Sequence, residues 1–308
     1  MIHPAPWTIR ALWHPRYWGY WALLPLLWLL ARLPVRWRMR LGAWLGRQMW
    51  RRNRKRQKII EINLGLCFPT QSAAERLALA QASAERAGQA LLDLCSLWLR
   101  SKADIRRRWV VHGREHLDAM LAQGLTPLIV LPHVVAIDMG AGMMSEACAG
   151  GLGPYNPTGK PFLDAWMSYG RTRFGGGLMT RQEGLRRMLK ALRTGEAVYY
   201  IPDEDHGAEH SVFAPFFGVS KATLPLLGRL TAQGDTRVLP FFPRLDAQSG
   251  QYHMHIEAPI AAFPSDAQAA AEAMNRVLEN MIRRDPTQYL WSFKLFKTRP
   301  EGEPDIYP

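Results

Sequence analysis

The chain has 308 residues, of which 48% are hydrophobic, and a formal net charge of +13. This length allows one large domain or two modest ones, and the ordinary apolar content excludes a polytopic membrane protein. The positive charge favours an anionic partner, either a membrane surface or a nucleic acid. Three cysteines without a C-x-x-C pair fit a reducing compartment and exclude a disulfide framework or a cysteine zinc site.

The first fifty residues contain eight of the twelve tryptophans and an uncharged apolar run at residues 17–31. A spanning helix needs roughly 20 residues, but snorkelling by Arg16 and Arg32 shortens that requirement. No small-residue cleavage site follows, which disfavours a signal peptide. We expect an anchor helix that spans or inserts deeply into a membrane, with a buried helix of a soluble domain as the alternative.

A basic segment follows this run. Between Arg36 and Lys58 there are ten Lys and Arg residues and no acid, and by the positive-inside rule this side is cytoplasmic. Trp37, Leu41 and Trp44 recur at helical spacing, which predicts an amphipathic helix lying among lipid headgroups; a solvated basic face on a core helix is the alternative. We divide the chain into a membrane anchor and basic segment, residues 1–59, and an α/β catalytic domain, residues 60–308.

The second part alternates predicted helices and short apolar strands, as in an α/β domain. Residues 63–69 predict a helix break, and Ser72 with Glu75 forms a capping box that opens a helix to about Arg100. Residues 213–218 are predicted to form an aromatic loop. Strands are predicted at residues 110–112, 128–131, 197–201, 237–243 and 252–258. Helices are predicted at residues 117–122, 136–149, 163–169, 185–192, 224–232 and 265–284.

His133 is the first candidate catalytic residue. It follows the apolar strand 128–131 and Pro132, and so falls at the carboxyl end of a core strand, where open α/β sheets place their active sites. Asp138 should lie on the first turn of the next helix. A histidine that titrates near neutrality can remove a hydroxyl proton, and a carboxylate on its other ring nitrogen would fix its tautomer. The alternative is a strand-end histidine beside an unrelated helix-start aspartate.

A second strand also ends in proline and polar residues, with Asp203 and Asp205 among them. Two strands that deliver polar residues at their carboxyl ends predict one shared cleft. His206 and His210 have metal-ligand spacing, but Gly207 disfavours a regular helix there, so we predict no metal.

Arginines surround the glycine run 175–177, and they predict a site for a phosphate or carboxylate. These arginines are Arg171, Arg173 and Arg181; surface arginines without a ligand are the alternative. Residues 153–160 are similar to a phosphate-binding loop, but the spacing is one residue too long and Pro161 replaces the required Ser or Thr, so we reject that function.

Several motifs coincide in one order. They are Asn-Leu-Gly-Leu-Cys-Phe-Pro at 63–69; His133 with Asp138; Arg171-x-Arg173-Phe-Gly; Tyr-Ile-Pro-Asp-Glu-Asp-His-Gly at 200–207; Ser-Val-Phe-Ala-Pro-Phe-Phe-Gly at 211–218; and Pro-Thr-Gln-Tyr-Leu-Trp at 286–291. In this order the set resembles the late acyltransferases of lipid A biosynthesis, the lauroyl/myristoyl transferase family. The resemblance covers nearly the whole chain.

The resemblance implies a single glycerolipid-acyltransferase-like α/β domain, with a mixed central sheet flanked by helices, behind an N-terminal membrane anchor helix. It implies an enzyme on the cytoplasmic face of the bacterial inner membrane. Such an enzyme moves a fatty acyl chain from acyl carrier protein to a hydroxyl of a 3-hydroxyacyl chain on the Kdo-bearing lipid A precursor. It needs no cofactor, because the thioester is already activated, and it binds no nucleic acid.

The resemblance also suggests residue roles. His133 takes the position of the family's catalytic base and Asp138 that of its acid, Arg171 is carried over as a substrate-site residue, and Asp203 belongs to the second motif. Glu204 stands where the family usually has an amide. A different lipid acceptor, such as a lysophospholipid or an aminolipid, remains the alternative within enzymes. From another class, a non-catalytic membrane or nucleic-acid binding module would leave the ordered motifs unexplained.

Overall fold

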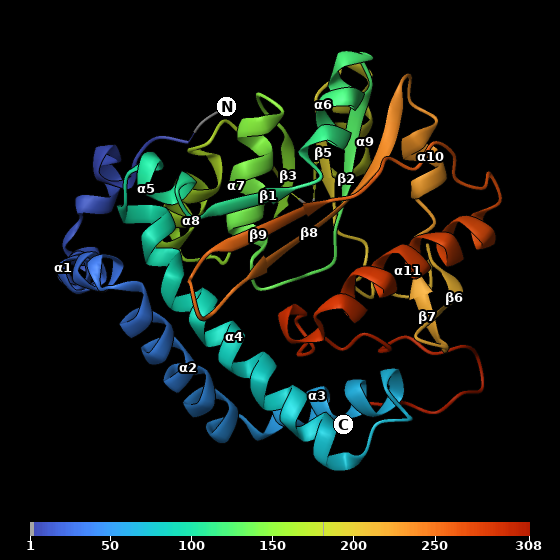
Figure 1. Ribbon diagram of the computed structural model, residues 1–308, viewed down its shortest axis with the longest axis horizontal. Helices are drawn as coiled ribbons and strands as arrows, with labels where there is room; N and C mark the ends of the chain where they lie inside the picture. The colour runs from blue at the N-terminus through green and yellow to red at the C-terminus, as the bar shows by residue number, and fades with distance from the viewer. Residues whose placement is uncertain (1–2, 181) are drawn as a thin grey trace.

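The computed structural model of the protein describes residues 3–180 and 182–308, and it shows helices packed around a central sheet (Figure 1). The strands are β1 (Trp109–His112), β2 (Thr126–Val130), β3 (Leu152–Tyr155), β4 (Gly177–Thr180), β5 (Val198–Tyr200), β6 (Val212–Phe216), β7 (Val219–Thr223), β8 (Thr236–Leu245) and β9 (Tyr252–Ile256). The helices are α1 (Trp18–Arg32), α2 (Val35–Arg52), α3 (Arg54–Cys67), α4 (Ala73–Leu99), α5 (Lys102–Arg106), α6 (Arg114–Ala122), α7 (Ile137–Ala147), α8 (Pro161–Thr172), α9 (Gly184–Arg193), α10 (Leu227–Thr231) and α11 (Ala267–Arg284). Short 3₁₀ turns lie at Pro6–Thr8, Arg10–Trp13, Pro15–Tyr17 and Pro286–Gln288.

The central sheet has seven strands in the order β1-β9-β8-β2-β5-β3-β4. Neighbours are parallel except β8 and β9, which are antiparallel, so β1 and β9 run against the other five strands. The predicted mixed sheet flanked by helices is therefore confirmed. Every residue of β2 is buried, as expected of a strand covered on both faces.

Two local predictions were wrong, and one strand was not predicted, because tertiary contacts override the local signals. The segment predicted as an aromatic loop forms a hairpin of β6 and β7 that packs beside α11. The glycine run leads directly into β4, which pairs with β3. Helix α3 continues through Asn63 to Cys67, since the buried Asn63 side chain donates hydrogen bonds to the carbonyls of Trp291 and Phe293, both at 2.7 Å. Its polar side chain is satisfied there, and the helix is not interrupted.

Helices α2 and α4 run side by side along one edge of the molecule (Figure 1). Their crossing is built from glycine. A Cβ atom on Gly88 would lie 2.3 Å from the carbonyl oxygen of Gly42 and 2.4 Å from the amide nitrogen of Gly46. Only residues without a side chain permit backbones to approach this closely. The crossing fastens the N-terminal segment to the α/β part of the chain.

A buried ion cluster reinforces this contact. The carboxylate of Asp93 on α4 is fully buried and lies 2.7 Å from Arg38 Nε and 2.5 Å from Arg108 Nη2. It also accepts a hydrogen bond of 2.7 Å from the hydroxyl of Tyr252 on β9. Burial alone would favour the neutral acid, but the two arginines and Tyr252 lower the pKa of Asp93. The cluster therefore connects α2, α4 and the sheet through the buried carboxylate of Asp93.

The predicted anchor helix corresponds to α1, which has 15 residues and contains Pro25. At 1.5 Å per residue it is about 22 Å long, shorter than a hydrocarbon core of about 30 Å. Among residues 3–180 and 182–308, no helix combines the length and the apolar character that crossing a membrane requires. The expectation also included a helix that inserts deeply without spanning, and this part stays a prediction.

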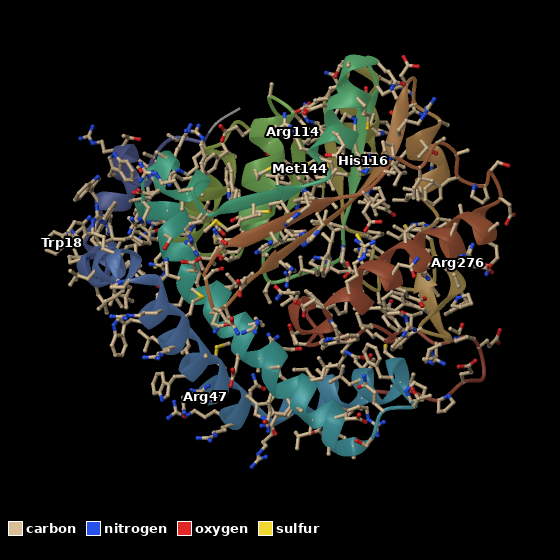
Figure 2. All side chains as sticks on the ribbon, viewed as in Figure 1. Trp18, Arg47, Arg114, His116, Met144 and Arg276 are labelled. Atoms are coloured by element: carbon tan, nitrogen blue, oxygen red, sulfur yellow. The ribbon has the colours of Figure 1, made fainter. Side chains whose placement is uncertain are left out.

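Large apolar side chains are nevertheless exposed on α1 and α2. Trp18 projects from the rim of the molecule, and Arg47 projects from the outer side of α2 (Figure 2). The buried side of α2 instead consists of Arg38, Met39 and small residues. The exposed large residues of the two helices are Trp18, Tyr20, Leu23, Leu26, Trp28, Leu29, Trp37, Leu41, Trp44 and Met49. The apolar stripe predicted for residues 36–58 therefore faces outward and not into the core.

Candidate active site

The imidazole of His133 is hydrogen-bonded to Asp203. Nδ1 of His133 lies 2.5 Å from Oδ1 of Asp203, and the backbone amide of His133 donates to Oδ2 of the same carboxylate at 2.8 Å. A carboxylate on Nδ1 selects the tautomer that carries its proton there, which leaves Nε2 as a proton acceptor. The carboxylate partner expected for His133 was Asp138; the structure assigns that position to Asp203.

The sheet register explains why these two residues meet. Strands β2 and β5 are parallel neighbours, with Val130 opposite Tyr200. Beyond each strand the chain continues through one apolar residue and a proline, so His133 and Asp203 occupy equivalent positions. Proline ends the ladder at the same level in both strands. The prediction that the two strand ends share one cleft is confirmed.

The pair is electrostatically coupled. Burial by itself favours a neutral ring, but the Asp203 carboxylate, its hydrogen bond and the nearby Glu204 together raise the pKa of His133. Burial likewise favours a neutral Asp203, yet its contacts with His133 lower the pKa of that carboxyl. Oε1 of Glu204 lies 3.8 Å from Nε2 of His133, on the side of the ring away from Asp203.

The C-terminal segment at residues 290–293 contacts His133 and positions it. The amide of Leu290 donates to the carbonyl of His133 at 2.9 Å, and the ring of Phe293 packs against the imidazole at 4.9 Å between centroids. Because Asn63 on α3 binds the carbonyls of Trp291 and Phe293, helix α3 fixes this segment. Asn63 therefore acts on His133 only through the segment that it positions.

Asp138 forms a separate pair with Arg171. It lies on the first turn of α7, as predicted, and its Oδ1 atom is 2.5 Å from Nε of Arg171 at the end of α8. The Arg171 guanidinium also lies over the ring of Tyr155, 5.5 Å from its centroid. The Asp138 charge raises the pKa of Arg171, so this arginine is held as a cation at the site.

His133, Asp138, Arg171 and Glu204 all line one cavity of about 1180 Å³. This volume exceeds the range of about 300–1,000 Å³ that is common for small-molecule sites. Polar residues share the wall of this cavity with many apolar residues. The apolar wall includes Leu91 and Leu94 of α4, Ile137 of α7, Leu178 and Met179 of β4, Met188 of α9 and Leu226.

The structure separates the other predicted residues. The Arg173 guanidinium donates to the carbonyls of Leu97 and Arg100, and this buried residue is not among the described residues that line the cavity. Asp205 accepts hydrogen bonds from Thr298 and from the amide of Gly207, so it ties a loop to the C-terminal segment. Neither residue lines the cavity, and the substrate contacts expected of Arg173 and Asp205 stay a prediction. Arg181 lies outside the described residues.

Further residues line the cavity, from the loop after β5 and from α10. His206 and His210 line the cavity with Glu204, and Arg229 adds a second positive charge. Sequence reasoning did not assign Arg229, which carries no motif signal of its own. Of the residues that the structure describes, those grouped closely enough to hold a metal ion are three histidines elsewhere, on β1 and β9.

A histidine beyond the end of a central strand, with a carboxylate on one ring nitrogen, a paired arginine and a large cavity with many apolar residues are together typical of an enzyme active site. Comparison with known proteins narrows this class. The family model described as bacterial lipid A biosynthesis acyltransferase matches residues 8–298. The chain therefore belongs to the family of bacterial lipid A biosynthesis acyltransferases, and it is an acyltransferase.

Three relatives illustrate the range of the family. A lipid A biosynthesis acyltransferase of Haemophilus influenzae is 35% identical over 95% of this chain and 92% of its own length. The lipid A biosynthesis lauroyltransferase of Escherichia coli K12 is 36% identical over 96% of this chain and 97% of its length. The myristoyltransferase of the same organism is 34% identical over 96% and 94%. The two Escherichia coli relatives are named for different acyl chains.

Proposed function

We propose that the protein transfers a fatty acyl chain from acyl carrier protein to the hydroxyl of a 3-hydroxyacyl chain on the Kdo-bearing lipid A precursor. The observation that carries this proposal is the His133–Asp203 pair at the wall of a cavity large enough for a lipid chain. The family membership supports acyl transfer in lipid A biosynthesis, and the donor and the acceptor are our inference.

In the proposed reaction Nε2 of His133 removes the proton from the acceptor hydroxyl. The alkoxide oxygen forms a bond to the thioester carbonyl carbon, the carbon–sulfur bond breaks, and the carrier thiolate takes up a proton from the imidazolium. Asp203 stabilises the imidazolium through Nδ1. Arg171, positioned by Asp138, places a positive charge where the carbonyl oxygen becomes an anion.

The charge of the protein suits both substrates. Acyl carrier protein is acidic, and the proposed acceptor carries phosphates and carboxylates. Arg171 and Arg229 face the cavity, and the chain as a whole carries a net charge of +13. Complementary charge of this kind accelerates encounter and selects an anionic substrate over a neutral one.

We further propose that α1 and α2 hold the protein on the cytoplasmic surface of the bacterial inner membrane. Exposed tryptophans alternate there with exposed arginines, and Arg32 lies over the ring of Trp28 at 3.7 Å. A helix with apolar and basic residues on its outer face binds in the plane of an anionic bilayer. Such docking would bring the lipid acceptor to the protein without a spanning helix.

The test is acyl transfer by purified protein in lipid micelles, with acyl carrier proteins of several chain lengths and the lipid A precursor. Mass spectrometry of the precursor would report the added chain. We expect His133→Ala to lower turnover by about 10²–10⁴-fold, whereas His116→Ala, on α6 outside the cavity, should retain full turnover. Near-normal turnover by folded His133→Ala protein would contradict the proposed base.

A competition assay tests the identity of the proposed acceptor. A lysophospholipid and an aminolipid would be offered beside the lipid A precursor in the same assay. We expect the precursor to be acylated preferentially. Preferential acylation of either competitor would contradict the proposed acceptor. It would leave the proposed role of His133 as the base unaffected.

A further inference from the structure

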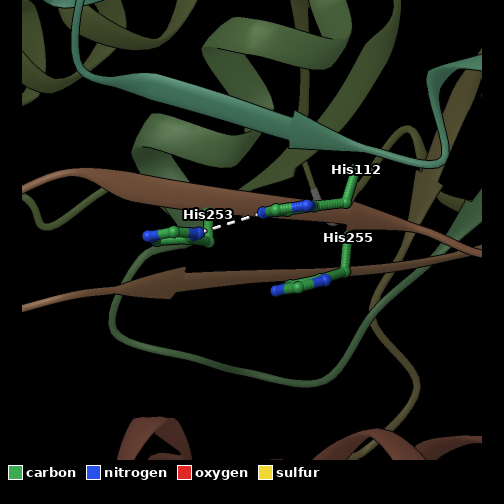
Figure 3. A group of neighbouring side chains, drawn as sticks. All are labelled: His112, His253 and His255. Carbon is green, nitrogen blue, oxygen red and sulfur yellow. Dashed lines mark hydrogen bonds between the residues drawn. The ribbon is translucent and has the colours of Figure 1, made fainter.

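Three histidines gather on the two strands that run against the rest of the sheet. His112 at the end of β1 is the register partner of His255 on β9, and His253 is two residues before His255 on the same face (Figure 3). Side chains at i and i+2 of a strand project from one face. The three rings therefore come together because of strand register, and the cluster is separate from the residues that line the cavity.

The rings are already close to one another. Nε2 of His112 lies 3.0 Å from Nδ1 of His253, and one ligand nitrogen from each of the three histidines lies within 4.8 Å of the others. The rings are stacked, with 4.5 Å between the centroids of His112 and His255. Histidine nitrogens are preferred ligands of Zn²⁺, Cu²⁺, Ni²⁺ and Co²⁺.

We propose that His112, His253 and His255 form a binding site for a divalent transition metal ion of the zinc class. The metal would take one nitrogen from each ring and a water molecule in the fourth position, because His112 is exposed to solvent and the other two are half-buried. Three imidazoles and a water are a well-established tetrahedral set for Zn²⁺.

Binding requires a modest rearrangement. Tetrahedral Zn–N bonds of about 2.0–2.1 Å place ligand nitrogens about 3.3–3.4 Å apart, so the most distant pair must approach. Stacked rings must also tilt until their lone pairs point at one centre. The χ2 torsion of histidine is broad, so half-exposed rings can turn at small expense. The hydrogen bond between His112 and His253 breaks, and a change of tautomer exposes the second lone pair without net release of a proton.

The charges around the cluster permit a cation. Arg244 lies opposite His253 on β8, but it is paired with Asp285 at 3.7 Å. Arg284 is paired with Glu257 at 2.8 Å. Asp246 adds a negative charge that acts on His253. Each arginine therefore has a carboxylate partner that reduces its repulsion of a bound cation.

Burial favours the neutral form of the two histidines on β9. Burial, followed by the positive neighbours Arg244 and His112, lowers the pKa of His253. Burial and the same neighbours lower the pKa of His255 to about 4.

The test uses the full chain, purified without a histidine tag and stripped with a chelator. Isothermal titration with Zn²⁺ would measure affinity and stoichiometry, and the visible spectrum with Co²⁺ would report tetrahedral geometry. We expect one ion per chain and intense tetrahedral Co²⁺ bands. Each of His112→Gln, His253→Gln and His255→Gln should weaken Zn²⁺ binding by more than the roughly 10–100-fold that follows loss of an outer-shell partner.

His116→Gln is the matched control, because His116 lies on α6 (Figure 2) and is not part of the cluster. It should bind Zn²⁺ as tightly as the unchanged protein. The proposal is overturned if the unchanged protein shows no stoichiometric Zn²⁺ binding, or if the three Gln variants bind as tightly as His116→Gln. Far-ultraviolet circular dichroism of each variant would verify that it is folded.

Discussion

Nδ1 of His133 lies 2.5 Å from Oδ1 of Asp203, and the two residues stand at equivalent positions beyond neighbouring parallel strands. The two aspartates Asp203 and Asp138 therefore have different partners in the site. Asp203 contacts the histidine, and Asp138 contacts Arg171. The role of each aspartate can be tested separately by substitution.

Replacing Asp203 by Asn should lower acyl transfer by roughly 10²–10⁴-fold, because the amide no longer stabilises the imidazolium. The pH dependence supplies a second measurement. Since Asp203 raises the pKa of His133, the unchanged enzyme should lose kcat/KM as the pH falls through a value above 6.5. In Asp203→Asn this acid limb should move to lower pH. An unchanged limb would show that Asp203 does not act on the base.

Replacing Asp138 by Asn should leave the acid limb of kcat/KM in place, because Asp138 does not contact the imidazole. It should weaken the hold on Arg171 and so reduce kcat, with Arg171→Lys giving a similar loss. Steady-state kinetics of the two variants and of the double variant would test this. Additive losses would contradict a shared function, since residues that act as a unit are non-additive.

The glycine crossing of α2 and α4 should tolerate no side chain. Gly88→Ala places a methyl group against the backbone of Gly42 and Gly46, and overpacking of this kind lowers the free energy of unfolding by about 1–3 kcal/mol or more. Gly65→Ala is the control, because open space surrounds that helical position. It should raise stability by roughly 0.5–1 kcal/mol. Denaturant unfolding would measure both, and equal values would contradict the packing argument.

The buried Asp93 cluster should contribute more to the free energy of unfolding than a surface ion pair does. Asp93→Asn leaves Arg38 and Arg108 without their counter-ion, and breaking a buried pair costs about 3–5 kcal/mol. Glu85→Gln removes the partner of Arg47 on the surface and should change stability by no more than about 1 kcal/mol. Thermal unfolding of both variants would reveal the difference. A loss in Glu85→Gln as large as in Asp93→Asn would refute it.

The outer face of α2 should determine membrane binding. Trp37→Gln with Trp44→Gln removes two exposed indoles, and we expect several-fold weaker binding to vesicles that contain anionic lipid. Leu121→Gln, which removes an exposed apolar residue from α6, should bind as the unchanged protein does. Vesicle sedimentation at two salt concentrations would compare them. Equal binding by all three proteins would place the membrane contact elsewhere.

Much of the fold was predictable because its signals are local. The apolar run before Pro132, the capping box at Ser72 and the helical start at Asp138 each depend on residues a few positions apart. The class of protein was also predictable, since ordered motifs along the chain carried the family resemblance that the family match bears out.

The pairing of the site residues could not be predicted from the sequence and became visible only in the tertiary structure. Asp138 is five residues from His133 and Asp203 is seventy, yet Asp203 holds the ring, because β5 is the neighbour of β2 in the sheet. Strand order depends on packing across the whole chain and leaves no local trace. The glycine crossing of α2 on α4 and the histidines of β1 and β9 are likewise contacts between distant segments. Sequence alone determined which chemical groups stand at the ends of strands, and the packing of the sheet decided which of them meet.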